Sequence, residues 1–135
     1  MALEAVCRNW RFILRREFAG DDEGFISRLQ QDVIWDRESF REMVIAMREA
    51  CLLYAADEEL ERWVAHGFFY VPAFVRGWTN QPEFPRPEAN YWRGALAVLE
   101  ELSHWYFWGD PPSDVGDIDS VWFEDKYPFE NECAI

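Results

Sequence analysis

The residue pair that most suggests chemistry is Glu101 and His104, which have the Glu-x-x-His spacing of di-iron helical bundles. Three residues apart on a helix, the two side chains share one face. A di-iron centre needs a second such pair and two further glutamates. The only other histidine, His66, has Trp63 at the matching position. Half of the ligand set is therefore missing, and we predict neither a metal site nor a cofactor here.

Calcium is the alternative that the acidic residues 110–119 suggest. An EF-hand loop needs oxygen ligands at its first, third and fifth positions, followed by a glycine. Starting from Asp114, the third position is Gly116 and the fifth is Ile118. The spacing fits a solvated acidic loop better than a calcium site, although a non-standard cation site stays open.

Nucleophilic catalysis would need a cysteine or serine with a base and an orienting acid. Cys51 and Cys7 both fall on apolar helical stripes, where buried and inert thiols are expected. Nothing near Cys133 in sequence would lower the pKa of its thiol. The glycines are scattered singly, so no phosphate-binding loop is present. We therefore expect that the protein is not an enzyme.

Composition narrows the possible classes further. The 135 residues include 26 acidic and 13 basic side chains, for a net charge of −13, and half of the residues are hydrophobic. Such a chain should fold around one core. Its charge argues against direct binding to nucleic acid or to an anionic membrane. Arginines interrupt the apolar N-terminus, and three widely spaced cysteines suit reduced thiols, so we expect a cytoplasmic protein.

Helical periodicity dominates the chain. The first helix should end near Gly20, and a second should run from Asp21 or Asp22 to about Ile34. A capping box of Ser39 and Glu42 predicts the start of the third helix. Its apolar stripe continues to Tyr54.

The second half of the chain is less regular at its start. Asp57 is predicted to cap a fourth helix that ends at Gly67, and residues 68–71 fit either a strand or a helix. Residues 72–78 are predicted as helix and residues 79–88 as a loop. A long helix over residues 88–108 should be the central one, because it is apolar around most of its circumference.

These elements predict a mainly α fold, a single-domain bundle of five or six helices. Residues 1–108 form the helical core in this interpretation. Residues 109–135 form an irregular acidic and aromatic tail packed on the same domain, with room for one short strand or hairpin at residues 121–123.

Charge is concentrated at the C-terminal end. Residues 1–19 carry +2, residues 20–99 carry −6 and residues 100–135 carry −9. Arg8, Arg11 and Arg15 share one helix face, where they should neutralise acidic neighbours. An acidic surface with aromatic anchors suits a basic protein partner. We predict a partner-binding surface made of Asp110, Asp114, Asp117, Asp119, Trp122, Phe123, Glu124 and Asp125.

In size, charge and aromatic content the chain is similar to small bacterial immunity proteins and to phage anti-CRISPR proteins that mimic nucleic acid. That resemblance implies an inhibitor that occludes the site of a basic protein, such as a nuclease toxin or a nucleic-acid-binding effector. Carboxylates would stand where the phosphates of the substrate bind.

Two other functional classes remain open. The first is a small-molecule-binding or catalytic helical domain, with a pocket lined by Tyr70, Trp78, Tyr91 and Trp105. The second is a subunit of a larger assembly, in which surface aromatics form the contact. The sequence leaves the oligomeric state open.

Overall fold

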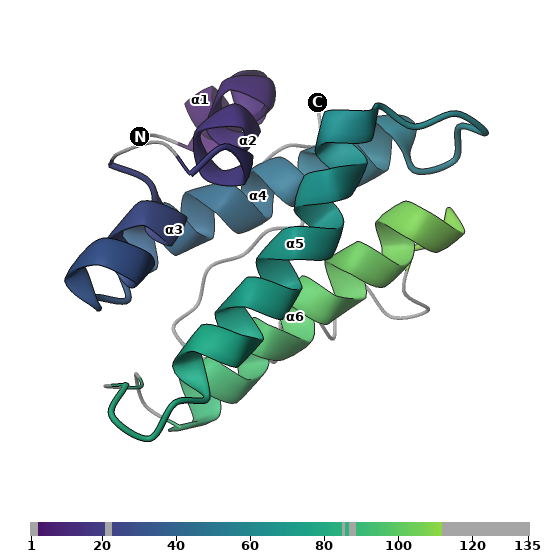
Figure 1. Cartoon of the computed structure of the whole chain (residues 1–135). Coiled ribbons are helices and arrows are strands. Elements are labelled where there is room, and N and C mark those ends of the chain that lie inside the picture. The colour runs from purple at the N-terminus through teal and green to yellow at the C-terminus, as the bar shows by residue number, and fades with distance from the viewer. Residues whose placement is uncertain (1–2, 21–22, 85, 87–88, 112–135) are drawn as a thin grey trace.

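The computed structural model describes residues 3–20, 23–84, 86 and 89–111, and this part of the chain is mainly helical (Figure 1). It contains six α-helices and one π-helical turn, and no strand. Their bounds are α1 Leu3–Arg8, α2 Trp10–Phe18, α3 Phe25–Ser27, η1 Arg28–Asp32, α4 Arg37–Tyr54, α5 Arg62–Thr79 and α6 Ala89–Trp108. The predicted mainly α fold is confirmed. The strand or hairpin predicted at residues 121–123 lies outside the described residues.

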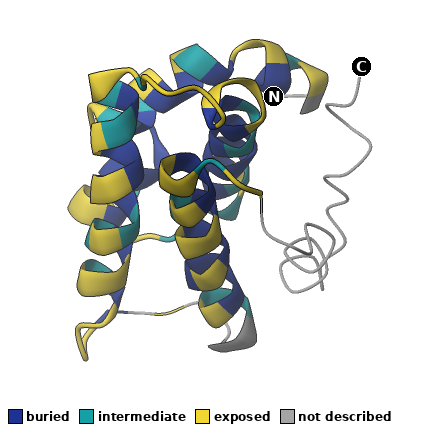
Figure 2. Cartoon of the chain, turned by 90° about the vertical axis from the view of Figure 1, so that its right-hand side faces the viewer, coloured by how far each residue is buried: buried dark blue, intermediate teal, exposed yellow. Residues whose placement is uncertain are grey.

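One core joins the helices. Helices α5 and α6 lie side by side, and α2 packs on both α4 and α5 (Figure 1). The inner faces of the helices are buried and the outer faces are exposed (Figure 2). At the centre, the rings of Phe68 and Tyr106 stack in parallel with centroids 4.1 Å apart, which joins α5 to α6. Large side chains fill the interior: Phe25, Phe40, Met43, Met47 and Leu99 are all fully buried.

Helix α4 begins earlier than the predicted capping box. Its N-cap is Asp36, whose carboxylate accepts a hydrogen bond from the backbone N–H of Ser39 at 3.2 Å. Ser39 is therefore inside the first turn, and its hydroxyl donates to the backbone carbonyl of Asp36. Partial burial would raise the pKa of Asp36, but the hydrogen bonds from Ser39 and the charge of Arg28 lower it. The predicted cap was wrong because Asp36, three residues upstream, caps the helix by accepting from the N–H of Ser39 itself.

The helix predicted from residue 21 or 22 to 34 is shorter and irregular. Helix α3 lasts only three residues before η1, and the turn ends at Val33 in the left-handed region with φ of 56°. The predicted caps Asp21 and Asp22 lie outside the described residues. Glu17 of α2 caps α3, because its carboxylate accepts hydrogen bonds from the backbone N–H groups of Phe25 and Ile26 at 2.7 and 2.9 Å.

Glu17 is 1% exposed, and burial raises the pKa of its carboxyl despite those two bonds and the charge of Arg16. Gly24 completes this cap. A Cβ at Gly24 would lie within 2.9 Å of the Glu17 carboxylate, so a glycine is needed where the chain crosses it.

Helix α5 is continuous where the sequence predicted two separate pieces. Gly67 does not end a helix, Pro72 does not begin one, and residues 68–71 are helical rather than extended. The N-cap position is Glu61, so Asp57 is not the cap. Phe18 explains Gly67, because a Cβ there would come within 2.4 Å of the Phe18 ring. Position 67 therefore requires a glycine because α2 and α5 cross closely there, and not because a helix ends there.

The remaining boundaries follow the sequence closely. Gly20 and Gly109 have φ of +72° and +84°, as expected of glycines that end α2 and α6. The predicted first helix is interrupted at Asn9, whose side chain donates a hydrogen bond to the carbonyl of Ala5 at 2.8 Å.

Candidate functional site

The predicted partner-binding surface falls almost wholly outside the part of the chain that the structure describes. Asp110 is described, and it is exposed just after Gly109 at the end of α6. The other seven residues of that surface lie outside the described residues: Asp114, Asp117, Asp119, Trp122, Phe123, Glu124 and Asp125. The surface remains a prediction.

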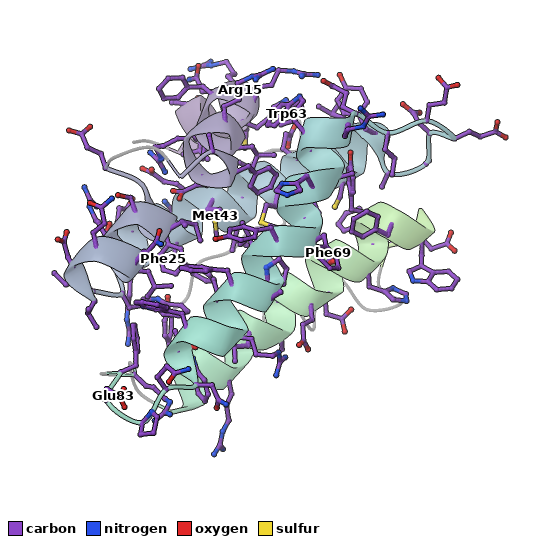
Figure 3. The ribbon with its side chains drawn as sticks, viewed as in Figure 1. Arg15, Phe25, Met43, Trp63, Phe69 and Glu83 are labelled. Carbon is purple, nitrogen blue, oxygen red and sulfur yellow. The ribbon has the colours of Figure 1, made fainter. Side chains whose placement is uncertain are left out.

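The N-terminal arginines are used within the fold. Arg11 of α2 forms a bidentate ion pair with Glu61 at the start of α5, with N–O distances of 2.6 and 3.1 Å. The Arg15 guanidinium lies over the Trp63 ring, 4.2 Å from its centroid, and Figure 3 shows the two side chains together where α2 meets α5. These contacts support the expectation that this arginine face neutralises or covers groups of the same molecule.

Other arginines are paired in the same way, and many carboxylates are not. Arg16 pairs with Glu17 and Glu42, Arg28 with Asp36, and Arg76 with Glu100. Several acids have no ion pair within the described residues: Glu4, Glu23, Asp32, Glu49, Asp57, Glu58, Glu59, Glu83, Glu101 and Asp110. The charge left over on this part of the molecule is therefore mostly negative.

Acids and aromatics meet at the turn between α4 and α5. A cavity of about 180 Å³ opens there, and we call it the acidic-turn cavity. Its walls come from α2, α4, the turn, α5 and α6: Trp10, Tyr54, Asp57, Glu59, Glu61, Val64 and Tyr106. Sequence reasoning missed this site, because Asp57 and Glu59 were interpreted only as charges favourable to a helix N-terminus. The available signal in the sequence was the presence of two acids, Asp57 and Glu59, shortly after the aromatic Tyr54.

Two groups in this cavity have shifted pKa values. The hydrogen bond from Arg11, with a second from the Trp63 indole at 2.9 Å, lowers the pKa of Glu61 to about 2. Burial raises the pKa of Tyr106 to about 12, and the nearby negative charges of Glu61 and Asp57 add to that effect. At neutral pH Glu61 is thus ionised and Tyr106 is a neutral hydroxyl.

Two larger hollows are wider open. One, of about 610 Å³, lies between α2 and the start of α4 and is lined mainly by charged side chains, including Arg15, Arg28 and Glu38. The other, of about 690 Å³, lies between α2 and α5 and includes Phe18, Trp63 and His66. Arg15 lines both hollows.

The four aromatics of the alternative small-molecule pocket have separate surroundings. Trp105 is 5% exposed in the core, and none of the four lines the three hollows above. Tyr91 accepts a hydrogen bond from the Trp35 indole at 3.3 Å, and the Trp78 indole donates to the carbonyl of Leu29 at 2.9 Å. Tyr70 instead belongs to a stack along α5.

That stack runs at four-residue spacing along one side of α5. His66 stacks on Tyr70, Tyr70 on Phe74, and Phe74 on Trp78, with centroids 5.5 to 6.0 Å apart and rings within 19° of parallel. We call these four residues the aromatic ladder. Phe69, beside it in sequence and labelled in Figure 3, is among the most exposed apolar side chains of the described residues.

The structure also describes the residues that were considered for metal binding and nucleophilic chemistry. Glu101 and His104 are exposed on α6, where the His104 ring stacks on Trp108. The described residues hold no group of three histidine, cysteine or carboxylate ligands suited to a metal ion.

The cysteines differ from one another. Cys51 is a buried free thiol, and burial raises its pKa. Cys7 is buried too, but it is disulfide-bonded, so the expectation that all the thiols are reduced was wrong for it.

Within the described ranges, no helix is both long and apolar enough to cross a membrane. Comparison with protein-family models, with curated proteins and with solved structures finds no match to this chain.

Proposed function

We propose that this protein is a small acidic inhibitor that binds a basic protein, such as a nuclease toxin or a nucleic-acid-binding effector, and occludes its site. The mechanism is steric and electrostatic, without covalent chemistry. Carboxylates of the inhibitor occupy the positions where the basic protein would bind phosphates, and aromatic side chains anchor the contact.

One observation carries the proposal: the arginines of the described body are largely engaged by its own acids and rings, whereas many of its exposed carboxylates are not. An acid paired with an arginine contributes little net field at the surface, because the two charges cancel at a distance. Unpaired carboxylates instead produce an outward negative field, which speeds encounter with a basic partner and repels nucleic acid.

The test is to capture the partner from the native host with the full chain and to measure the association rate of the purified pair as salt rises. From about 0.01 M to 0.15 M salt the Debye length falls from about 30 Å to about 8 Å. We expect association to slow at least tenfold over that range, and the captured protein to lose its nucleic-acid activity when bound. An association rate independent of salt, or a captured partner that is itself acidic, would overturn the proposal.

A further inference from the structure

Cys7 of α1 is disulfide-bonded, and the composition of the chain narrows the choice of its partner. The sequence contains three cysteines, which are Cys7, Cys51 and Cys133. Cys51 is a free thiol, buried in the core, and its Sγ–H donates to the backbone carbonyl of Leu102 at 3.6 Å. Within this sequence, Cys133 is therefore the cysteine that can complete the bond.

A second copy of the chain is a poorer source of the partner sulfur. Cys7 is only 5% exposed and belongs to the hydrophobic core cluster. A disulfide requires the two Cα atoms to lie within about 7 Å of each other. Two copies could bring their Cys7 residues so close only after exposing them, at a cost in core packing. A segment of the same chain can pack against α1 as part of the fold.

The described body ends close to Cys7. Trp10 follows Cys7 by three residues, so their Cα atoms lie within about 11 Å of each other. The Trp10 ring packs against that of Tyr54 with centroids 5.8 Å apart, and both line the acidic-turn cavity together with Tyr106 of α6. Tyr106 is in turn three residues from Gly109, which ends α6. The chain therefore leaves α6 at the end of the bundle where Cys7 lies.

The remaining chain is long enough to return to that end. Cys133 follows Gly109 by 24 residues. At roughly 3.3 Å per residue this segment spans up to about 80 Å when extended, far more than the return requires. The entropic cost of closing a segment grows only slowly with its length. Its two ends can thus meet the body at neighbouring points.

We propose that Cys7 and Cys133 form a disulfide that closes residues 109–133 into a loop on the helical body. The bond forms by exchange with a small disulfide such as oxidised glutathione. One cysteine thiolate attacks the oxidant and releases one glutathione thiol, and the second cysteine thiolate then displaces the other. The pair loses two protons and two electrons, and the oxidant is reduced to two thiols. Cys51 takes no part, because the core buries it.

The consequence for binding rests on the proposed function. The partner-binding surface predicted within residues 110–125 lies in the sequence between the two points of attachment, Gly109 and Cys133. A segment fixed at both ends has fewer conformations to lose when a partner binds it. The disulfide therefore lowers the entropic cost of presenting that surface.

The test maps the cysteines of the full chain, purified without reductant, alkylated with N-ethylmaleimide while unfolded, and digested with trypsin. Cleavage after arginine and lysine places the three cysteines in separate peptides, residues 1–8, 49–62 and 127–135. We expect mass spectrometry to find peptides 1–8 and 127–135 linked, and peptide 49–62 alkylated. Alkylation of peptide 1–8, or its linkage to a second copy of itself or to peptide 49–62, would overturn the proposal.

A second measurement separates a bond supported by the fold from chance oxidation. The equilibrium of the pair with reduced and oxidised glutathione is measured in native buffer and in concentrated guanidinium chloride. We expect the fold to favour the linked form at least about thirtyfold over the unfolded chain, as native disulfides do. Cys51→Ala is the matched control and should leave both the linkage and this ratio unchanged. Equal equilibria in the folded and unfolded chain would overturn the proposal.

Cys133→Ala tests the consequence for binding. This variant should dissociate from the captured partner several-fold faster than the linked parent, because its segment must be ordered on binding. Linked peptides with an unchanged dissociation rate would overturn that consequence. Linked peptides in a chain that captures no basic protein would overturn the proposed function and leave the disulfide standing.

Discussion

Glu61 accepts the side-chain hydrogen bonds that hold the N-terminus of α5 to α2. It stands at the N-cap position of α5, accepts both prongs of Arg11 from α2, and accepts the Trp63 indole N–H. One exposed carboxylate therefore links two helices that are distant in sequence. Its pKa of about 2 records how strongly the folded state favours the ionised form.

The lowered pKa has a defined consequence for stability. A carboxyl whose pKa falls from 4.5 in the unfolded chain to about 2 in the fold contributes stability above pH 4.5 and loses it as pH falls towards 2. We expect Glu61→Gln to be less stable than the parent at pH 7, with the difference shrinking below pH 4.5 and vanishing near pH 2. Urea unfolding midpoints of the two proteins across this range measure it. A difference that stays constant with pH would show that Glu61 acts through something other than its charge.

At the scale of the element, α5 combines two glycines with opposite roles. Gly67 lies against Phe18, where a Cβ would overlap the ring, whereas a Cβ at Gly77 would meet nothing within 4 Å. The same substitution in one helix should therefore have opposite effects. Tertiary packing determines the effect of a substitution at Gly67, and backbone entropy determines the effect at Gly77.

We expect Gly67→Ala to destabilise the protein by about 1–3 kcal/mol or more, because α2 and α5 must separate. Gly77→Ala should stabilise it by about 0.5–1 kcal/mol, since alanine loses less conformational freedom in a helix. Denaturant unfolding of both variants provides the comparison, with each serving as the control of the other. Equal effects at the two positions would contradict the close crossing.

The boundaries of these helices show what the sequence could predict. Helical period predicted α4, and period together with the C-terminal Gly109 predicted α6, to within a few residues, because those signals are local. Gly67 and Pro72 carry the same local signals as a helix end, and only the Phe18 ring reveals otherwise. The cap on α3 was equally hidden, since its acceptor Glu17 lies eight residues away in the chain. The acidic-turn cavity draws its walls from five segments, so no single window contains it.

At the scale of the whole molecule, the position of the unpaired charges determines how a partner is attracted. Arg11, Arg16, Arg28, Arg41 and Arg76 form ion pairs with acids of the helical body, and the last 36 residues carry −9. The partner-binding surface predicted within residues 110–125 therefore contributes much of the net field. Its role in binding can be separated from the effect of net charge alone.

The separation uses two variants with the same change in charge. One reverses Asp117, Asp119, Glu124 and Asp125 to lysine, and the other reverses Glu4, Asp32, Glu83 and Glu101, which have no ion pair in the described body. Both should slow association with the captured partner. The first should also speed dissociation, because it removes direct contacts. Stopped-flow or surface-based kinetics distinguish the two. Identical dissociation rates would place the interface elsewhere.

The aromatic ladder has a consequence for how α5 opens. Pro72 lacks an N–H, so the carbonyl of Phe68 loses its helical hydrogen bond and the helix has a weak point at its middle. The stack of Tyr70 on Phe74 bridges that point. Amide protons on both sides of Pro72 should therefore exchange with solvent deuterium at one common rate, as a single cooperative unit. In Phe74→Ala the two halves should exchange at different rates, with the C-terminal half faster.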